Sequence, residues 1–432
     1  MKRLLIVTTL DYGYYSNNRV HHLVDQFKQR FEDVTVMYTK VYIAKTHTLY
    51  QQLKGLLTLS LRTQNKGNVR FIEVDRFLNH IGGLGLNILG LDTPYLVPHS
   101  LIKRVLRRIF STMGFISDLA ILPSFFIAYL LKDRSKKDVF IGQGPWEVAF
   151  GYLLRQLGLV KTLIYDDFDY SPGYQYISKF RRFYTSMLEI FCLKRADLII
   201  SVGSLLARLR EDQTGRKVHI IPNGVDYRHF QKAQIKKPHP RTLIYMGYIY
   251  DWAGLDLIVE ALAKIKQDIS DIRFLILGHT SPDYIKKILN MAKDLGVDRH
   301  VQYLGNKRYR ELIDYLAEAD VGMAVFRPVE LRRYAFSLKV IEYMSSGLPV
   351  ITTKDTQSGS LVEDYQCGEA VEYNTDDIVR AIHNLLLDKD RYKRYSENAK
   401  RFSREYDWEE LLGKRYYELI KEYYQQDLVT NR

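Results

Sequence analysis

Short runs of hydrophobic and β-branched residues recur along the chain. They alternate with longer segments whose hydrophobic residues are spaced as on one face of a helix; segment 255–266, for example, has aliphatic residues at positions 255, 258, 259, 262 and 265. Strands that alternate with amphipathic helices are typical of an α/β fold, in which helices cover both faces of parallel sheets. The expected strands are 4–9, 34–38, 139–142, 162–165, 198–202, 242–246, 274–278, 301–304, 321–326 and 349–352.

The alternation weakens at 211–216 and again across the polar stretch 231–241, which indicates a domain boundary near residue 213. A chain of 432 residues is also too long for one ordinary core and fits two domains. We therefore expect an N-terminal domain over 1–212 and a C-terminal domain over 213–407. A helix expected at about 408–425 has no strand after it and could pack back on the N-terminal domain.

Residues 42–116 depart from this alternation. Within them, segment 101–110 predicts an amphipathic helix with a basic face, and a later segment, 179–184, interleaves cations with aromatic residues. Both segments could lie against an anionic bilayer, because basic amphipathic helices bind in the interfacial plane. A surface helix with a solvated basic face explains 101–110 equally well, so both interpretations stay open at this point.

The composition favours a globular protein in a reducing compartment. Hydrophobic residues make up 46% and charged residues 26%, and the two cysteines, Cys192 and Cys367, lie far apart, so neither a disulfide framework nor a cysteine zinc site is expected. The apolar run 4–10 is short and favours a buried strand over a signal peptide, and window 119–131 is too short to cross a bilayer. We expect a cytoplasmic protein, peripheral on the inner face of the cell membrane if its basic segments bind lipid.

The net charge of +13 predicts attraction to a polyanion, such as nucleic acid, an anionic membrane or a phosphorylated ligand. Charge alone does not choose among them. No helix-turn-helix, zinc-finger or RNP-like pattern is visible, so nucleic acid is not an expected partner.

The most informative segment joins a strand at 319–325 to a helix that opens near Ser337 and closes at Gly347. Backbone N–H groups in the first turn after Ser337 could bind a phosphate, and Lys339 would add a cation there. Glu342 lies a further turn along, where a carboxylate could accept two hydrogen bonds from a ribose diol. A surface carboxylate without a ligand is the alternative for Glu342.

This helix, together with the run IPNGVD at 221–226 and the segment GLPV at 347–350, resembles the GT-B glycosyltransferases, especially glycosyltransferase family 4 and its relatives. The resemblance covers most of the C-terminal half and, more loosely, the layout of the whole chain. It implies two Rossmann-like, doubly wound domains that face each other across a cleft. It also implies a nucleotide-sugar donor on the C-terminal domain, an acceptor on the N-terminal domain, no cofactor and no required metal.

Position by position, Glu342 matches the second glutamate of a paired-glutamate motif, which in the family binds the nucleotide ribose. Tyr334 stands where the first glutamate would be, and this leaves open whether the reaction retains or inverts the configuration of the sugar. The sequence from Ser337 onward resembles that of a subgroup in which a lysine in the first helical turn takes part in donor binding. The resemblance therefore implies that Lys339 contacts the diphosphate, with Ser337 and Leu338 beside it.

Further candidates for the donor site lie at the carboxyl ends of strands, where ligands gather in doubly wound folds. Gly247, Gly278 and Gly305 each end a strand, and the resemblance implies that backbone near Gly305 receives the base. The loop after Gly247 is basic in many family members but carries Asp251 here, so phosphate charge must come from elsewhere. Arg327 is the next candidate because a guanidinium binds phosphate oxygens in pairs, and a solvated loop arginine is the alternative.

In the N-terminal half, the residues after the first strand are expected to face the acceptor. Gly13 would let the backbone approach a phosphate or a sugar, Tyr14 offers a ring for stacking, and Arg19 and His21 open the following helix. His21 and His22 are adjacent, so they point in different directions on a helix, and no third ligand is spaced nearby. No metal site is expected.

Asp166, Asp167 and Asp169 come directly after the strand 162–165. Three carboxylates without basic neighbours in the run should raise one another's proton affinity, which suits a general base acting on an acceptor hydroxyl. They could instead bind a divalent cation or cap the next helix, and the resemblance favours the base, with Asp169 and Asp166 matching related YDxxD sequences best. Glu147 lies where related enzymes often place a catalytic histidine and is a lesser candidate.

The expected function is transfer of a sugar from a UDP- or GDP-sugar to a hydroxyl of a lipid-linked or polysaccharide acceptor at the cytoplasmic membrane face. Two alternatives remain on the same fold: a nucleotide-sugar epimerase or phosphorylase, and a catalytically silent scaffold that binds polyanions or membranes.

Overall fold

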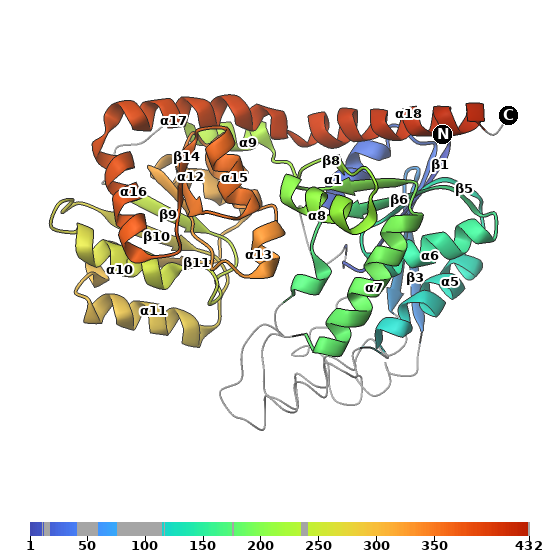
Figure 1. The fold of residues 1–432 in the computed structure, drawn as a ribbon, viewed down its shortest axis with the longest axis horizontal. Helices are drawn as coiled ribbons and strands as arrows, with labels where there is room; N and C mark the ends of the chain where they lie inside the picture. Colours follow the sequence, from blue (N-terminus) through green and yellow to red (C-terminus); the bar gives the residue numbers. More distant parts are fainter. Residues whose placement is uncertain are drawn as a thin grey trace, which may run out of the picture. The chain divides into compact units, whose positions relative to one another are not determined.

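The chain forms two compact units. One consists of Met1–Ile221 with Leu412–Arg432 and the other of Pro222–Leu411 (Figure 1). The computed structural model describes residues 1–10, 12, 18–40, 59–75, 115, 117–174, 177–234 and 241–430. The division follows Ile221, whereas the sequence places it near residue 213, because β8 (His219–Ile220) pairs with β7 and so stays with the first unit.

The first unit is built on an eight-stranded sheet in the order β3-β4-β2-β1-β5-β6-β7-β8. The pair β3·β4 is antiparallel, and every other pair in this sheet is parallel. The strands besides β8 are β1 (Arg3–Thr8), β2 (Asp33–Thr39), β3 (Ser60–Lys66), β4 (Val69–Asp75), β5 (Lys137–Gly142), β6 (Val160–Asp167) and β7 (Leu198–Ser201).

Helices cover both faces of this sheet. The core on one face joins Leu5 and Val7 of β1 to residues of α5, α6 and α7, whereas the alternate residues Leu4 and Ile6 point to the opposite face. The helices of this unit are α1 (Arg19–Phe27), α5 (Ile121–Lys132), α6 (Pro145–Gln156), a short 3₁₀ turn at Ser171–Gly173, α7 (Lys179–Arg195) and α8 (Ser204–Thr214).

The second unit has a fully parallel six-stranded sheet in the order β11-β10-β9-β12-β13-β14. The order reverses direction at β9 and β12, and such a reversal is where doubly wound folds bind ligands at the carboxyl ends of their strands. The strands are β9 (Thr242–Met246), β10 (Arg273–Leu277), β11 (Val301–Gly305), β12 (Val321–Ala324), β13 (Val350–Thr353) and β14 (Gly368–Val371).

Right-handed crossovers place α10 and α11 on one face of this sheet and α14 and α15 on the other. The α-helices are α9 (Tyr227–Phe230), α10 (Leu255–Ile265), α11 (Pro282–Asp294), α12 (Leu312–Ala317), α13 (Glu330–Tyr334), α14 (Leu338–Ser345), α15 (Gln357–Asp364), α16 (Thr375–Leu387) and α17 (Lys389–Phe402). Short 3₁₀ turns lie at Gln231–Gln234, Asp298–His300, Tyr309–Glu311 and Ser403–Tyr406.

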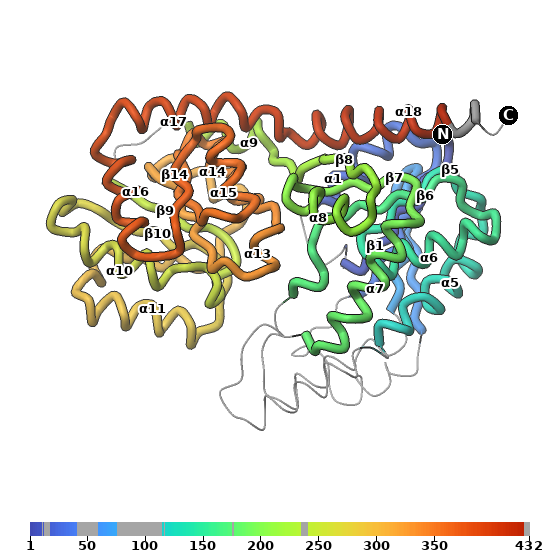
Figure 2. The backbone as a smooth tube through the Cα atoms, viewed as in Figure 1, coloured from blue at the N-terminus to red at the C-terminus, as the bar shows by residue number. Residues whose placement is uncertain are grey.

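The last residues of the chain return to the first unit (Figure 2). A π-helical segment, Glu409–Tyr416, continues into α18 (Tyr417–Thr430). The Tyr416 ring lies 5.6 Å from that of Phe27 in α1, and the Tyr424 hydroxyl donates to Asp138 at 3.2 Å. A terminal helix is thus part of the N-terminal unit.

The prediction of an α/β fold with two parallel sheets is confirmed, and each of the ten expected strands is present. Four observed strands were not predicted. β3 is polar and mostly exposed at the edge of its sheet, so it lacks a buried pattern, and its partner β4 falls in the segment that departs from the alternation. The strand β8 spans only 2 residues, and β14 (GEAV) is half-buried at its centre and carries a glycine and a glutamate in place of a hydrophobic run.

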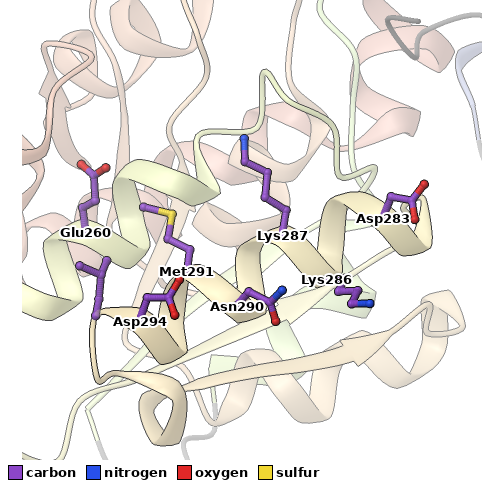
Figure 3. A pocket seen from close by; sticks show the side chains of 8 residues that line it. Glu260, Asp283, Lys286, Lys287, Asn290, Met291 and Asp294 are labelled. Atoms are coloured by element: carbon purple, nitrogen blue, oxygen red, sulfur yellow. The ribbon is translucent and has the colours of Figure 1, made fainter. Parts of the chain in front are cut away.

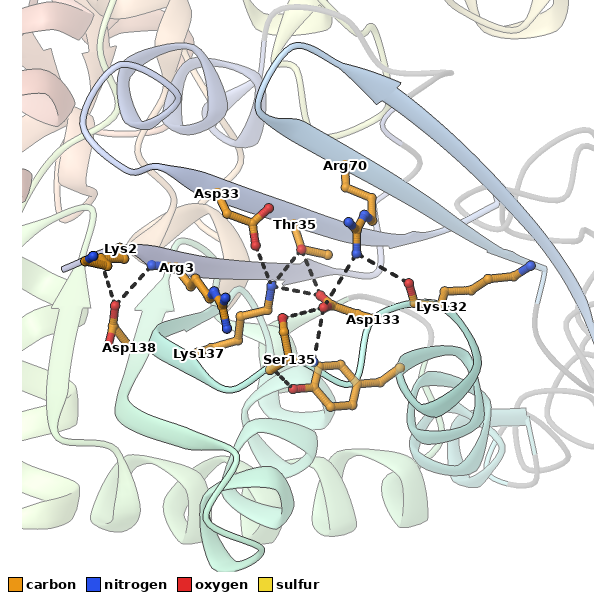
Figure 4. Close-up of polar contacts among 11 residues, drawn as sticks. Lys2, Arg3, Asp33, Thr35, Arg70, Lys132, Asp133, Ser135, Lys137 and Asp138 are labelled. Carbon is orange, nitrogen blue, oxygen red and sulfur yellow. Dashed lines mark hydrogen bonds and ion pairs between the residues drawn. The ribbon is translucent and has the colours of Figure 1, made fainter.

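A buried polar network joins the amino ends of β2 and β5 in the first unit (Figure 4). The Lys137 ammonium lies 2.8 Å from Asp133 and 3.3 Å from Asp33, and it donates to Thr35 at 2.8 Å. Burial acts to raise the pKa of Asp133, but the Lys137 charge and the hydrogen bonds outweigh it and lower this pKa. The network lies at the end of the sheet opposite the carboxyl ends, so it holds the fold and does not form the candidate site.

Among the described residues, no helix is both long and apolar enough to cross a membrane.

Candidate functional site

Three glycines lie at the carboxyl edge of the second sheet: Gly247 and Gly278 follow β9 and β10, and Gly305 is the last residue of β11. Gly278 N–H donates to the Gly305 carbonyl at 2.9 Å, and Gly247 N–H donates to the Leu277 carbonyl at 3.0 Å. Gly278 has φ +145°, and a Cβ there would lie 1.7 Å from the Gly247 carbonyl oxygen. Only glycine fits at Gly278, because the backbone of Gly247 packs directly against it.

The helix α14 begins at the same edge, with Ser337 as N-cap (φ −83°, ψ 110°) and Leu338 as its first residue. This start is where the sequence predicts it. Tyr343 holds the helix close to the sheet, because its hydroxyl accepts from Met246 N–H at 2.8 Å and a Cβ on Gly322 would lie 2.3 Å from its ring. The first turn of α14 is thereby fixed beside the end of β9.

Lys339 in this first turn lies over Gly247. Its Nζ is 3.1 Å from the position that a Cβ on Gly247 would occupy, and it is 3.8 Å from the centroid of the Tyr245 ring and 5.0 Å from that of Phe326. Burial and the nearby Arg332 charge lower the pKa of Lys339, and Glu342 acts in the opposite direction. The structure thus brings Lys339 and the helix start, which the sequence had linked, next to Gly247, which it had singled out separately.

Glu342 follows one turn later on the same face of α14. Its burial raises its pKa to about 7, an effect that the Lys339 charge reduces. A carboxylate that is costly to ionise without a partner is stabilised when hydroxyl groups donate to it, which fits the expected ribose contact.

Arg327 lies at the same edge but faces the loop after β9. Its NH1 is 4.0 Å from Asp251, and its backbone N–H donates to the Trp252 carbonyl at 2.9 Å. Asp251 therefore offsets the charge of Arg327, so this arginine is a weaker phosphate candidate than the sequence suggested.

The loop 248–252 carries a row of aromatic rings that the sequence analysis did not single out. Tyr248 and Tyr250 stack at 6.2 Å, and Tyr250 lies 5.5 Å from Trp252, which contacts Phe326 at 5.9 Å. The alternation of aromatic residues at 248, 250 and 252 was the available signal. Arg332 of α13, also not predicted, lies with its Cζ 3.8 Å from the centroid of the Trp252 ring.

In the first unit, Asp166 is the second-last residue of β6 and forms a buried ion pair with Arg19 of α1. Arg19 donates to both carboxylate oxygens at 2.8 to 3.1 Å, and Gln143 donates to one of them at 3.0 Å. The run 165–170 itself has no basic residue, but the fold brings Arg19 to Asp166 from 147 residues away. A carboxylate whose oxygens already accept these hydrogen bonds holds Arg19 in place.

Asp167 has a different arginine. Arg210 of α8 donates to Asp167 at 2.7 and 3.3 Å and to Glu189 of α7 at 2.9 Å, and all three side chains are buried. Burial raises the pKa of Asp167, and it raises that of Glu189 to about 7, although the Arg210 charge acts to lower both. Here too the basic partner comes from outside the run, 43 residues further along the chain.

Asp169 is half-buried and accepts hydrogen bonds from Tyr170 N–H at 3.1 Å and from the Tyr174 hydroxyl at 2.6 Å. Glu147, by contrast, is 2% exposed and accepts from Thr9 N–H at 2.7 Å, so it fixes the end of β1. Of the carboxylates predicted for catalysis, Asp169 is the one whose surroundings suit a base.

His21 is held within the first unit by its own neighbours. Its ring nitrogens contact Asn18 Oδ1 at 2.6 Å and the Tyr12 carbonyl at 2.9 Å, and burial lowers its pKa. Gly13, Tyr14 and segment 101–110 lie outside the described residues. No cluster of three or more metal-ligating side chains occurs in the part of the chain that the structure describes.

A shallow groove of about 630 Å³ lies between α10 and α11 (Figure 3). No predicted site residue lines it, and acidic and basic side chains are mixed along it without converging on one point. Its lining is Glu260, Asp283, Lys286, Lys287, Asn290, Met291, Asp294 and Leu295.

The second unit is similar to a known family of proteins. Residues 227–402 match the family described as glycosyl transferases group 1. Among curated relatives, the phosphatidyl-myo-inositol mannosyltransferase of Mycolicibacterium smegmatis is 26% identical over 214 residues, which cover 48% of this chain and 53% of the relative. The chain spans about half the length of the curated relatives it matches.

Solved structures show the same fold over the whole chain. The sucrose-phosphate synthase of Thermosynechococcus elongatus has a TM-score of 0.69 at 17% identity, with 100% of each chain covered. Anabaena Alr3699/HepE in complex with UDP has a TM-score of 0.64 at 14% identity, with 98% of this chain and 100% of the other covered. The fold is GT-B, and the predicted resemblance to the GT-B glycosyltransferases is confirmed.

Proposed function

We propose that the protein is a glycosyltransferase that takes its sugar from a nucleotide-sugar donor bound at the carboxyl edge of the second sheet. The observation that carries this proposal is the position of Lys339 over Gly247 at the start of α14, with Glu342 one turn later. The match of residues 227–402 to a glycosyltransferase family supports it, as does a neighbour of the same fold that was solved with UDP.

In this proposal the first turn of α14 stabilises the leaving diphosphate. Charge develops on that group as the bond to the sugar breaks, and the Lys339 ammonium and the free N–H groups after Ser337 are already oriented toward it. Glu342 accepts hydrogen bonds from the ribose, and the backbone after β10 and β11 lies beside the base.

The first unit supplies the acceptor side. In an inverting reaction Asp169 takes the proton of the attacking hydroxyl, while Arg19, fixed by Asp166, binds the acceptor or a phosphate. In a retaining reaction the leaving phosphate takes that proton instead. Replacement of the first motif glutamate by Tyr334 leaves both reactions possible, and analysis of the anomeric product separates them.

A thermal-shift titration with UDP, GDP, dTDP and ADP tests the donor site. A nucleotide at about 100 times its dissociation constant is expected to stabilise the wild-type protein by roughly 2.7 kcal/mol. Glu342→Ala should lose most of this response because the ribose contact is gone, whereas Glu363→Ala, on α15, should keep it. If none of the four nucleotides shifts the melting of a cooperatively unfolding wild type, the proposed donor site is wrong.

The same titration at two pH values examines the ionisation of Glu342. Since its pKa is about 7, the carboxylate that accepts from ribose is mostly protonated at pH 6 and mostly ionised at pH 8. If only the ionised form binds, this equilibrium lowers affinity about tenfold between pH 8 and pH 6. Glu342→Gln should remove this part of the dependence and leave the part that belongs to the nucleotide.

We further propose that the acceptor is lipid-linked and is reached at the cytoplasmic face of a membrane. The supporting feature is an apolar stripe on α7 formed by Phe180, Phe183 and Met187, which are 48%, 64% and 57% exposed. Exposed Lys179 and Arg182 flank the stripe, whereas Arg181 is paired with Asp118 at 2.9 Å. Apolar side chains between cations fit the interface of an anionic bilayer.

Sedimentation with vesicles of phosphatidylglycerol and phosphatidylcholine tests this stripe. The double substitution Phe183→Ser with Met187→Ser should release most of the protein that pellets at low salt, since burying each side chain contributes about 1.5–3 kcal/mol. The control pair Leu153→Ser and Leu157→Ser, on exposed positions at the end of α6, should leave binding unchanged. Complete recovery of the wild type in the supernatant would contradict the proposal.

A further inference from the structure

The candidate base Asp169 lies on a tight turn that follows β6. A 3₁₀ turn closes it, in which Gly173 N–H donates to the Tyr170 carbonyl at 3.0 Å and Tyr174 N–H donates to the Ser171 carbonyl at 3.3 Å. The turn brings the Tyr174 hydroxyl back to the Asp169 carboxylate, to which it donates at 2.6 Å. The orientation of Asp169 therefore depends on how firmly this turn is held.

Two contacts anchor the turn on the buried cluster of Arg210, Asp167 and Glu189. The centroid of the Tyr170 ring lies 5.2 Å from the Arg210 Cζ, and the Ser171 hydroxyl hydrogen-bonds to Glu189. Arg210 itself is fixed by its hydrogen bonds to Asp167 and Glu189, and none of these three side chains is more than 1% exposed. The cluster thus contacts the two residues that directly follow Asp169.

Stability alone is a weak reason for such a cluster. The cost of removing ionised side chains from water offsets much of their attraction, so apolar side chains of the same volume often stabilise a fold equally well. Hydrogen bonds from buried polar groups do, however, hold their partners in one orientation. Here the partners are Tyr170 and Ser171 of the turn.

We propose that Glu189 and Arg210 are positioning residues, which hold the turn through Ser171 and Tyr170 and so orient Asp169 toward the attacking hydroxyl. This inference rests on the proposed function, in which Asp169 takes the proton of that hydroxyl in an inverting reaction. A general base must lie within hydrogen-bond reach of the proton that it removes, and a displacement of about 1 Å can lower the rate roughly 100-fold. Both side chains are buried, so they act through the turn.

Hydrogen exchange of the peptide that spans 168–174 tests the anchor without any substrate. In Ser171→Ala the amides of Gly173 and Tyr174 should exchange roughly 5- to 10-fold faster, because the turn loses its hydrogen bond to the cluster. Ser171→Thr keeps the hydroxyl and should match the wild type. Asp212→Asn, which changes an exposed carboxylate on α8, should also match it. Exchange in Ser171→Ala that equals that of the wild type would show that the anchor does not hold the turn.

The same exchange at two pH values tests the part played by Glu189. The groups that face its carboxylate are Arg210, Asp167, Tyr165, Ser171 and Cys192. Burial raises the pKa of Glu189 to about 7, and its ionised form accepts more strongly from a hydroxyl. After correction for intrinsic exchange rates, the turn should therefore be better protected at pH 8 than at pH 6. Glu189→Gln, which cannot ionise, should remove this difference, and a difference that persists would argue against Glu189 as an anchor.

Donor hydrolysis connects the anchor with catalysis, with UDP-glucose and GDP-mannose as probes. Water attacks the anomeric carbon, the bond from that carbon to the diphosphate oxygen breaks, and the proton of the water passes to Asp169. Ser171→Ala should lower kcat about 10- to 100-fold and leave KM for the donor unchanged, since the donor binds the second unit. Ser171→Thr should retain the kcat of the wild type, and Asp169→Asn should lower it at least as much as Ser171→Ala.

The outcomes separate failure of the inference from failure of the proposed function. If the wild type hydrolyses neither donor, or if Asp169→Asn keeps full activity, the proposed base is wrong and the positioning role falls with it. If the wild type is active, Asp169→Asn is impaired and Ser171→Ala keeps the kcat of the wild type, the base stands and the positioning role is wrong.

Discussion

Lys339→Met is expected to reduce kcat/KM for the donor by about 10²- to 10³-fold, the usual loss when one preorganised group that stabilises a developing charge is removed. Methionine keeps the length and packing of the side chain over Tyr245 and Gly247 but has no charge to offer the leaving diphosphate. The measurement is release of nucleoside diphosphate from the donor that binds the wild type, followed with and without acceptor. Lys286→Met, on the exposed face of α11, is the control and should retain full activity.

Thermal unfolding tests whether Lys339 stabilises the leaving diphosphate or instead supports the fold. Burial and the neighbouring Arg332 lower the pKa of Lys339, so its charged form costs folding free energy. Lys339→Met should therefore melt at the same temperature as the wild type or higher, even though its kcat/KM is greatly reduced. A variant that is both inactive and clearly destabilised would indicate that Lys339 supports the fold and would argue against the phosphate contact.

The second large effect is expected for Arg210, whose loss should lower the stability of the fold. Arg210→Met should lower the free energy of unfolding by about 3–5 kcal/mol, because it leaves Asp167 and Glu189 buried without their shared cation. Denaturant unfolding followed by circular dichroism measures the loss. Arg208→Met, at an exposed position of the same helix, should stay within about 0.5 kcal/mol of the wild type.

The loss should also depend on pH. The pKa of Glu189 is raised to about 7 in the fold, so the folded state holds a proton that the unfolded chain releases near its ordinary value. Stability from this group is present at low pH and is lost as pH rises toward 7. Arg210→Met should accentuate this trend and be more destabilised at pH 8 than at pH 6. An unfolding free energy that does not change with pH would show that these carboxylates are not buried as described.

The sequence predicts those parts of the molecule that depend on local pattern. Central strands such as β1 and β9 are buried on both faces and appear as continuous hydrophobic runs, whereas β3 is exposed at an edge and does not. Likewise, Lys339 and Glu342 belong to one helix. They lie on the same face of it because they are three residues apart. The glycines after β9 and β10 meet because parallel strands end at one edge.

The unpredicted contacts join residues that are distant along the chain. Arg19 precedes Asp166 by 147 residues, and Arg210 follows Asp167 by 43, so no local run shows that each carboxylate has its own arginine. The position of Arg332 at the candidate site was not predicted for a similar reason. Its position depends on Trp252, and the packing of an arginine on a ring leaves no periodic signal.

The return of the chain end to the first unit has a consequence for biosynthesis. Residues up to Ile221 emerge from the ribosome first, but the unit they belong to also needs the segment from Leu412 onward, which packs Tyr416 against Phe27. The second unit is contiguous in sequence and can complete its fold while translation proceeds. The first unit must therefore wait, with the α1 face uncovered, until the second unit has been synthesised.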